Sequence, residues 1–321
     1  MKVLITGYPG WLGNKLVEEA LKQDWYVRCL VLRGAKARHD VDVVRGDVRE
    51  LYSLVEATRD IDVVIHAAGV IHGKPSLLMD VNAYGTLNML RASVANNVKK
   101  FIYISSNSAA GYTKGKELMD EGVLRRPYMA YGKSKYLAEE YVRGFYETGK
   151  LKAMILRPTW FYGEGQPARM TKLFRMIKGG RPVIFGDGRN IRSMTYIGNL
   201  VEAIFLAVAA DDSAWNTSYW ISDKRPYTTN EIYETIAELL GVKEYKPVHL
   251  PTVFASLARA MDKSLQLLDL YSSYVHVAGE MTLNIACNIA KAKKILGYDP
   301  KVSLREGMEK AVKWCKRNKL I

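Results

Sequence analysis

MKVLITGYPGWLG, residues 1–13 of the chain, joins a short apolar run to a turn that contains three glycines. The apolar residues 3–5 predict a strand, and the amphipathic residues 13–23 predict a helix that opens at the last glycine. Such a turn lets the backbone approach a pyrophosphate, whose charge the free N–H groups of the helix N-terminus stabilise. The stretch therefore predicts a dinucleotide-binding turn, with contacts from Gly7, Pro9, Gly10, Trp11, Leu12 and Gly13.

Strands and helices alternate through the first half of the chain. Further strands are predicted at residues 27–32, 43–45, 63–66, 101–105 and 153–156, and helices at residues 51–57, 81–96 and 131–148. This alternation predicts an α/β fold with a Rossmann-type, doubly wound parallel sheet. After Pro158 the pattern loosens into glycine- and proline-containing turns, with later helices at residues 230–240, 252–274 and 304–318. We expect a dinucleotide-binding domain over residues 1–158 and a smaller C-terminal substrate-binding lobe over residues 159–321, interleaved with returning elements of the sheet.

The composition of the 321 residues, 48% of them hydrophobic, is that of a globular protein. No apolar run reaches about 18 residues, so no transmembrane helix is expected. The N-terminal apolar run ends in glycine rather than in a cleavage site, which favours a strand over a signal peptide. The three cysteines are odd in number, widely spaced and without metal-ligand spacing, which indicates a reducing, cytoplasmic location and no metal site.

The formal net charge of +14 raises the question of nucleic-acid binding. The lysines and arginines are spread along the chain, and neither a zinc-ligand set nor an aromatic RNA-binding pattern accompanies them. We therefore expect no nucleic-acid partner. A basic surface that attracts anionic small molecules, such as phosphorylated cofactors, agrees better with the glycine-rich turn.

The second predicted strand indicates which dinucleotide is bound. Residues 30–34 contain no Asp or Glu to meet an unphosphorylated adenosine ribose, whereas Arg33, Lys36 and Arg38 offer groups that bind a 2′-phosphate. This pattern favours NADP and leaves NAD open, the alternative for Arg33 being an ordinary surface position. Asp47 and Val48, after the next strand, are expected to contact the adenine.

Tyr131 and Lys135 are four residues apart in a predicted helix, which places both side chains on one face. A tyrosine hydroxyl titrates near pH 10, but a neighbouring ammonium lowers its pKa and lets it act as an acid or base. Ser105 and Ser106 end a predicted buried strand, and one of them is expected to hydrogen-bond the same substrate oxygen. The alternative for the pair is an ordinary exposed pair on a helix surface.

Together these motifs resemble the extended short-chain dehydrogenase/reductase family, in its NAD-dependent epimerase/dehydratase branch. The resemblance implies that Ser106, Tyr131 and Lys135 are catalytic. It adds further cofactor contacts from matching segments of this chain, namely His66, Ala67, Ala68, Gly69, Asn82, Ser105 and Pro158. Asn199, in place of the usual Asp, is more similar to the 3β-hydroxysteroid dehydrogenase-like branch.

The resemblance also identifies candidate substrate contacts. Asn107 and Ser108 stand where dehydratases of the family carry acidic residues, which makes sugar 4,6-dehydration doubtful. Arg192 is similar to an arginine that holds the substrate diphosphate in nucleotide-sugar enzymes. The resemblance further implies a homodimer, formed through the helices at residues 81–96 and 131–148.

Three functions compete at this point. The first is a NAD(P)-dependent oxidoreductase that transfers hydride to or from a hydroxyl or carbonyl carbon of a small, apolar or steroid-like substrate. The second is a nucleotide-sugar 4-epimerase or reductase. The third, from a different class, is a non-catalytic dinucleotide sensor or nucleic-acid-binding module, against which the Ser, Tyr and Lys set argues.

Residues 252–274 form a long amphipathic segment with apolar side chains at helical spacing: Phe254, Leu257, Met261, Leu265, Leu268 and Tyr271. The segment is compatible with the wall of an apolar substrate pocket or with peripheral contact to a membrane. We favour a third interpretation, a helix packed on the core of its own lobe.

Overall fold

The computed structural model of the chain describes residues 1–113, 115 and 117–321. Its centre is a seven-stranded sheet in the order β11-β6-β5-β4-β1-β2-β3, in which every neighbouring pair is parallel. The strands are β1 (Lys2–Thr6), β2 (Tyr26–Val31), β3 (Asp42–Arg45), β4 (Val63–His66), β5 (Lys100–Ile104), β6 (Lys152–Pro158) and β11 (Thr217–Ile221). The predicted α/β fold with a doubly wound parallel sheet is confirmed.

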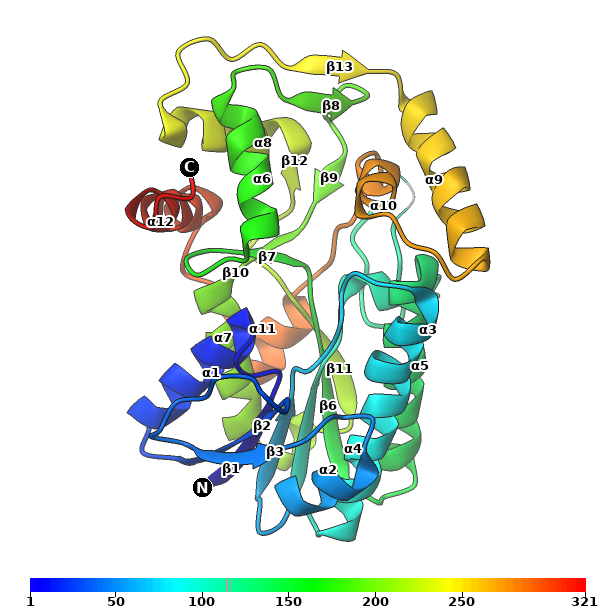
Figure 1. The fold of residues 1–321 in the computed structure, drawn as a ribbon, viewed down its shortest axis with the longest axis vertical. Helices are drawn as coiled ribbons and strands as arrows, with labels where there is room; N and C mark the ends of the chain where they lie inside the picture. Colours follow the sequence, from blue (N-terminus) through cyan, green and yellow to red (C-terminus); the bar gives the residue numbers. More distant parts are fainter. Residues whose placement is uncertain (114, 116) are drawn as a thin grey trace.

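Helices cover both faces of this sheet (Figure 1). One face carries α1 (Trp11–Lys22), α7 (Ile197–Ala209) and α11 (Ala290–Leu296), and the other carries α2 (Leu51–Ala57), α4 (Gly85–Ala95) and α5 (Met129–Glu147). Successive side chains of β1 therefore enter different cores: Val3 and Ile5 pack with α1 and α7, whereas Leu4 packs with α2 and α4. Burial on both faces explains why the strands are continuous apolar runs.

Three short elements pack against α5: α3 (Pro75–Leu78), the π-helix η1 (Met79–Tyr84) and the 3-10 helix η2 (Asn107–Ala109). A second 3-10 helix, η3 (Asp212–Ala214), follows α7 on the other face. The predicted helix at residues 81–96 is thus η1 followed by α4.

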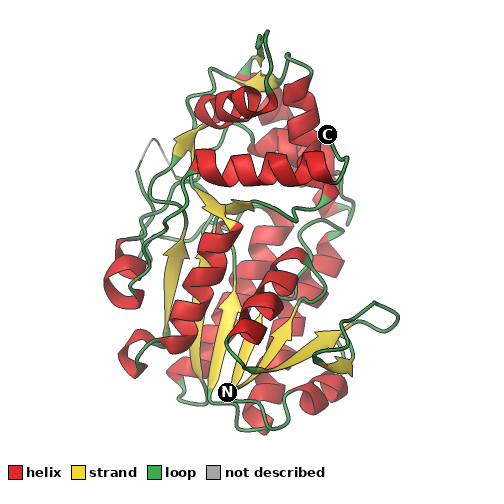
Figure 2. Cartoon of the chain, turned by 90° about the vertical axis from the view of Figure 1, so that its left-hand side faces the viewer, coloured by secondary structure: helices red, strands yellow, loops and turns green. Residues whose placement is uncertain are grey.

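The lobe lies above the carboxyl ends of the strands (Figures 1 and 2). Its helices are α6 (Ala168–Lys178), α8 (Thr229–Leu240), α9 (Thr252–Leu267), α10 (Ser273–Glu280) and α12 (Leu304–Arg317). Three two-stranded sheets join them, made of β7 (Trp160–Tyr162) with β10 (Met194–Tyr196), β9 (Ile191–Arg192) with β12 (Tyr227–Thr228), and β8 (Val183–Phe185) with β13 (Val248–Leu250). The space between strand ends and lobe is where a parallel sheet binds ligands.

Two expectations for residues 252–274 are wrong. The segment is two helices, because α9 ends at Leu267 and Asp269 adopts a left-handed φ of 55° before α10 begins. Its apolar stripe does not pack on the lobe core either. The face of α9 that packs inward carries the buried Ala255 and Asp262, so that Phe254, Leu257, Met261 and Leu268 remain 51–72% exposed. Among the described residues, no helix is both long and apolar enough to cross a bilayer.

Candidate active site

The glycine-rich turn between β1 and α1 forms a cradle that only glycines fit. Gly7 has a φ of 86°, and a Cβ there would lie 2.7 Å from the carbonyl carbon of Ala67. A Cβ at Gly10 or Gly13 would lie 2.6 Å from the Gly7 carbonyl oxygen. Gly10 caps α1 without a side-chain hydrogen bond, so the first N–H groups of α1 remain available to an anion. The predicted residues 7–13 and 67–69 therefore lie together and fit a pyrophosphate.

His66, at the end of β4, is completely buried between two threonines. Its Nδ1 lies 2.8 Å from Thr6 Oγ1 and its Nε2 lies 3.1 Å from Thr86 Oγ1. Burial lowers the pKa of the imidazole to about 3, so it is neutral. Thr6 Oγ1 in turn accepts the N–H of Ala68 at 3.0 Å. The imidazole thus positions the backbone of the loop after β4 and is not exposed to a ligand.

Asn82, on the π-helix η1, ties this loop to the catalytic helix. Its Oδ1 accepts the Val70 N–H at 2.8 Å, and its Nδ2 donates to the Val70 carbonyl at 2.8 Å and to Ser134 Oγ at 3.0 Å. A Cβ on Gly69 would lie 3.1 Å from Asn82 Oδ1 and 3.5 Å from Lys135 Nζ. The cradle and the predicted catalytic lysine are therefore adjacent.

The two serines after β5 have different partners. Ser105 Oγ donates at 2.6 Å to Glu139, whose carboxylate also accepts two hydrogen bonds, of 2.9 and 2.7 Å, from Arg157. Ser106 Oγ only accepts the Ser108 N–H, at 3.2 Å, as the N-cap of η2. The hydroxyl proton of Ser106 has no acceptor among the described residues and can be donated to a substrate oxygen. Ser105 is committed to the buried carboxylate.

Tyr131 lies in the first turn of α5, which packs against η2, the 3-10 helix that Ser106 caps. A Cβ on Gly132 would lie 2.4 Å from the Ser108 carbonyl oxygen, so α5 and η2 pack backbone to backbone. Lys135, one turn further on, is 4% exposed, and its Nζ donates to the Ile104 carbonyl at 2.9 Å. Burial lowers its pKa to about 8, which still leaves it charged at neutral pH. The segments that carry the three predicted catalytic residues, the end of β5 and the first two turns of α5, are therefore in contact.

Nζ of Lys135 also lies 4.8 Å from the centre of the Tyr103 ring. Tyr131 is close enough to Tyr103 to affect its ionisation electrostatically. Burial raises the pKa of Tyr103 well above its ordinary value, so that ring stays neutral. The neutral Tyr103 ring packs against the Lys135 ammonium with its aromatic face.

The predicted adenine side gathers at the ends of β2 and β3. The exposed Arg33 pairs with Glu50 at 3.2 and 2.9 Å, and Arg38 pairs with Asp40 at 2.7 and 2.6 Å. Asp47 accepts hydrogen bonds from Arg49, which lower its pKa. Exposed ion pairs of this kind are weak and easily exchanged for a ligand.

Three further residues of this side lie nearby. The Tyr8 hydroxyl accepts the Arg38 N–H at 3.0 Å, which links this segment to the glycine-rich turn. Lys36 is exposed on the same segment, and Val48 is buried against Gly85. At the opposite end, Pro158 ends β6 beside β11.

The predicted substrate residues surround a cavity of about 10 Å³, roughly the size of one water. Asn107 and Ser108 line it, together with Tyr128 and Glu280. Arg192 lies next to it, because its Nη2 donates to the Glu280 carbonyl at 2.5 Å. This guanidinium is 8% exposed, burial lowers its pKa, and its Nε has no partner among the described residues.

The sequence offered residues 252–274 as a possible pocket wall but did not identify the polar residues of α9 and α10 that face the site. Gln266 Oε1 accepts the N–H of Ala130, the residue before Tyr131, at 2.8 Å. Its Nε2 donates to Asp262 at 2.9 Å, and Asp262 lies 2.7 Å from His276 Nδ1. The available sequence signal was an Asp and a His, Asp262 and His276, within an amphipathic segment. Their importance can be recognised only once the inward face of α9 is known.

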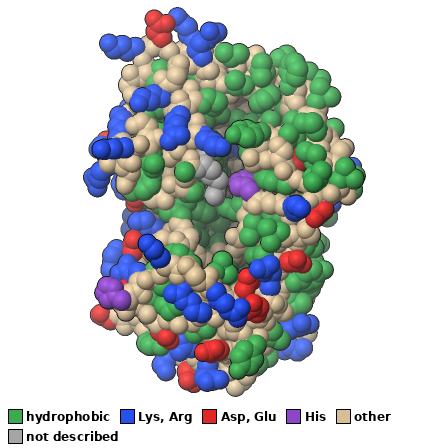
Figure 3. Space-filling view, in the orientation of Figure 1, with side chains coloured by type: hydrophobic (Ala, Val, Ile, Leu, Met, Phe, Trp, Pro, Cys, Tyr) green, Lys and Arg blue, Asp and Glu red, His purple; other side chains and the backbone are tan. Residues whose placement is uncertain are grey.

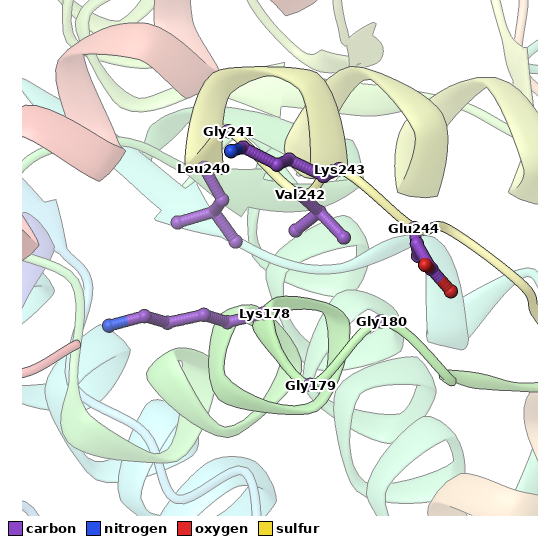
Figure 4. Close-up of a pocket in the computed structure, with 8 residues that line it drawn as sticks. All are labelled: Lys178, Gly179, Gly180, Leu240, Gly241, Val242, Lys243 and Glu244. Carbon is purple, nitrogen blue, oxygen red and sulfur yellow. The ribbon is translucent and has the colours of Figure 1, made fainter.

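A larger hollow of about 400 Å³ opens at the far end of the lobe (Figure 4). It lies between the ends of α6 and α8 and is lined by Lys178, Gly179, Gly180, Leu240, Gly241, Val242, Lys243 and Glu244. None of the predicted site residues lines it.

Comparison with known proteins gives a consistent picture. The model of the 3-beta hydroxysteroid dehydrogenase/isomerase family matches residues 4–252. The uncharacterized protein y4nL of Sinorhizobium fredii is 36% identical over 98% of this chain and 95% of its own length. N-acetyl-alpha-D-glucosaminyl-diphospho-ditrans,octacis-undecaprenol 4-epimerase of Escherichia coli O157:H7 is 32% identical over 78% of this chain and 75% of its own length. The solved structure of MoeE5 in complex with UDP-glucuronic acid and NAD superposes with a TM-score of 0.78 at 25% identity, over 99% of this chain and 100% of that one.

Proposed function

We propose that this chain, which belongs to the 3-beta hydroxysteroid dehydrogenase/isomerase family, is a nicotinamide-dependent 4-epimerase of a sugar carried on a diphosphate. One observation carries the proposal: Arg192 is a buried guanidinium with an unpartnered Nε beside the cavity of Asn107 and Ser108. A buried N–H without an acceptor costs free energy, and a phosphate oxygen supplies that acceptor in the geometry that arginine prefers. The similarity to the epimerase of Escherichia coli, whose name specifies a diphosphate-linked sugar, supports it.

The catalytic side chains divide the work around one substrate hydroxyl. Ser106 donates its proton to the hydroxyl oxygen, and Tyr131 removes the hydroxyl proton. Lys135, charged at neutral pH and on the same face of α5, stabilises the phenolate of Tyr131. A dinucleotide held by its pyrophosphate at residues 7–13 would supply the nicotinamide that takes up and gives back the hydride.

Inversion places a further demand on the site. Oxidation of the substrate hydroxyl gives a ketone. That ketone must rotate so that its opposite face receives the hydride, while the rest of the substrate stays bound. A diphosphate held by Arg192 supplies that fixed point, and Tyr131 then returns the proton to the inverted hydroxyl. Cofactor and proton are both restored at the end of a turnover.

For the cofactor we propose NADP in preference to NAD. Arg33 is exposed, and its pair with Glu50 is of the weak surface kind that a 2′-phosphate can displace. Glu50 is also a carboxylate able to accept a hydrogen bond from an unphosphorylated ribose, and MoeE5 is bound to NAD. Affinity for the two dinucleotides therefore depends on which of these two side chains meets the ribose.

A second candidate is net oxidation of an apolar alcohol, which the matching family's description favours. It differs from epimerisation in its stoichiometry, because reduced cofactor accumulates with each ketone formed.

The remaining expectations stay proposals. We propose a cytoplasmic protein, in which the three free, buried cysteines remain reduced. We further propose that residues 1–158 hold the dinucleotide, that residues 159–321 supply most of the substrate contacts, and that a second copy packs on α4 and α5.

The test is incubation of the purified chain and dinucleotide with diphosphate-linked N-acetylglucosamine, in a UDP-linked and a polyprenyl-linked form. Epimers are separated by chromatography while absorbance of the reduced nicotinamide is followed. We expect a new epimer without net reduction, and none from Tyr131→Phe, in which dinucleotide binding is retained. Stoichiometric reduction, or turnover by Tyr131→Phe close to that of the wild type, would contradict the assignment.

A further inference from the structure

One side of the lobe carries an exposed apolar stripe along α9. Val253, Phe254, Leu257 and Met261 are 51–61% exposed, and Leu267 and Leu268 at the end of the helix are 79% and 72% exposed. Their spacing places them on one face of the helix. In Figure 3 hydrophobic side chains gather at the upper right of the molecule, where Figure 1 places α9. We call these six residues the α9 surface.

The α9 surface continues beyond its own helix. Leu270, Tyr274 and Val277, in the turn after α9 and in α10, are also exposed. Asp269, in the same turn, accepts hydrogen bonds of 2.8 and 2.7 Å from the N–H and hydroxyl of Ser76 in α3. Leu77, the next residue of α3, is 37% exposed. The apolar face therefore extends over three elements, further than scattered surface side chains do.

The exposed charge of α9 itself is positive. Between residues 251 and 268 the only acidic side chain is that of Asp262, which is buried against His276. The exposed charge in that range is Lys263. Lys172 and Lys74 lie at the margins: Lys172 Nζ is 5.0 Å from the centre of the Tyr274 ring, and Lys74 is close enough to Asp269 to lower the pKa of its carboxyl. An apolar face with a lysine border, on a chain of net charge +14, complements an anionic lipid surface.

From this we propose that the α9 surface docks in the headgroup region of an anionic phospholipid bilayer. The hydrophobic side chains enter the boundary between headgroups and acyl chains, and the lysines contact lipid phosphates. A second copy of the chain fits this face less well. Two such faces in contact would oppose lysines to lysines, and the nearby carboxylate of Asp269 already accepts two hydrogen bonds from Ser76.

The docked face lies one helix away from the catalytic centre. The inner side of α9 holds Gln266, which binds the N–H of Ala130 in the first turn of α5. A bilayer against the outer side of α9 therefore reaches the substrate side of the molecule. If the proposed function is correct, a substrate whose diphosphate carries a long lipid keeps that lipid in the bilayer while its sugar enters the site.

The experiment is flotation of the purified full-length chain with two kinds of vesicle. One consists of phosphatidylcholine alone, and the other contains phosphatidylglycerol as well. We expect the wild type to float with the anionic vesicles, less with the neutral ones, and progressively less as salt is added. Leu257→Glu and Lys263→Glu are each expected to weaken flotation at least about ten-fold, since each removes a favourable contact and adds an unfavourable charge.

Ile295→Glu is the matched control, because Ile295 is a 44% exposed aliphatic side chain on α11, far from α9 in the fold. Circular dichroism verifies that all three variants are folded. Flotation of Leu257→Glu equal to that of Ile295→Glu would overturn the proposal, as would a wild type that does not float. So would sedimentation showing that Leu257→Glu instead dissociates a dimer, which would assign the face to self-association. Flotation is read without substrate, so its failure leaves the proposed epimerase activity to its own assay.

Discussion

Replacing Lys135 with methionine should make the folded chain more stable at neutral pH although it removes the activity. The ammonium is 4% exposed, and burial lowers its pKa from 10.5 to about 8. At 1.36 kcal/mol for each unit, keeping it charged in the folded state costs about 3 kcal/mol at pH 7. Methionine is similar in length and carries no charge, but it leaves the Ile104 carbonyl without its donor, which costs about 1–2 kcal/mol. The net gain is about 1–2 kcal/mol.

The pH dependence gives the sharper signature. Above pH 8 the folded wild type loses the proton on Lys135, whereas the unfolded chain keeps it up to pH 10.5. The unfolded state then binds more protons, so this residue makes the wild type more stable as pH rises between these values. Lys135→Met lacks the group and lacks this rise. The difference in unfolding free energy should therefore change by about 3 kcal/mol and reverse its sign about one unit above the lower value.

The assay is urea unfolding followed by circular dichroism, from pH 7 to pH 10.5, for wild type and variant. Lys133→Met, an exposed position on the same helix, is the matched control and should follow the wild type. A Lys135→Met variant that is less stable than the wild type at pH 7, with a difference independent of pH, would refute the argument that burial of the charge opposes folding.

Three further predictions concern other parts of the chain. Arg33→Ala should weaken binding of NADP roughly ten-fold and leave NAD nearly unchanged, whereas Glu50→Gln should strengthen NADP, as measured by fluorescence titration; equal effects on both dinucleotides would contradict the proposal. Asp262 and Glu280 raise the pKa of His276 above 6.5 although burial opposes this. The protonated imidazole therefore stabilises the fold fully below pH 6.5, and this stabilisation is lost as pH rises through the raised pKa. In denaturant titrations His276→Asn should show no such loss of stability with pH. Glu139→Gln should lower the unfolding free energy by about 3–5 kcal/mol because it leaves a buried guanidinium unpaired, whereas Glu140→Gln, at a partly exposed ion pair, should cost under about 1 kcal/mol; similar costs would disprove the assignment.

The sheet and the cradle could be predicted because their signals are local. Apolar runs, their spacing, and glycines at residues 7, 10 and 13 are properties of short windows of sequence. The division of work between Ser105 and Ser106 is not local, since it depends on Glu139 reaching the strand end from α5. Glu50, the carboxylate that pairs with Arg33, likewise comes from another element, so a search of residues 30–34 for a carboxylate could not find it.

The amphipathic segment at 252–274 shows a different limit. Its periodicity predicts that one face is apolar, but periodicity does not specify what that face contacts. The buried polar pair of Asp262 and His276 turned the stripe outward, because their mutual hydrogen bond makes them the inward side of α9 and α10. Apolar spacing was therefore a good guide to helix formation and a poor guide to orientation.

The return of the chain to the sheet at β11 has a consequence for truncated fragments of this protein. β11 pairs along β6 from Met154 to Pro158, and the β6 residues Met154, Ile155 and Leu156 are completely buried. A fragment that stops at residue 158 would leave β6 as an apolar edge strand, paired with β5 alone, whose free N–H and C=O groups invite association with other chains. Expression of the first half alone should therefore yield aggregates, and the two halves have to fold as one cooperative unit.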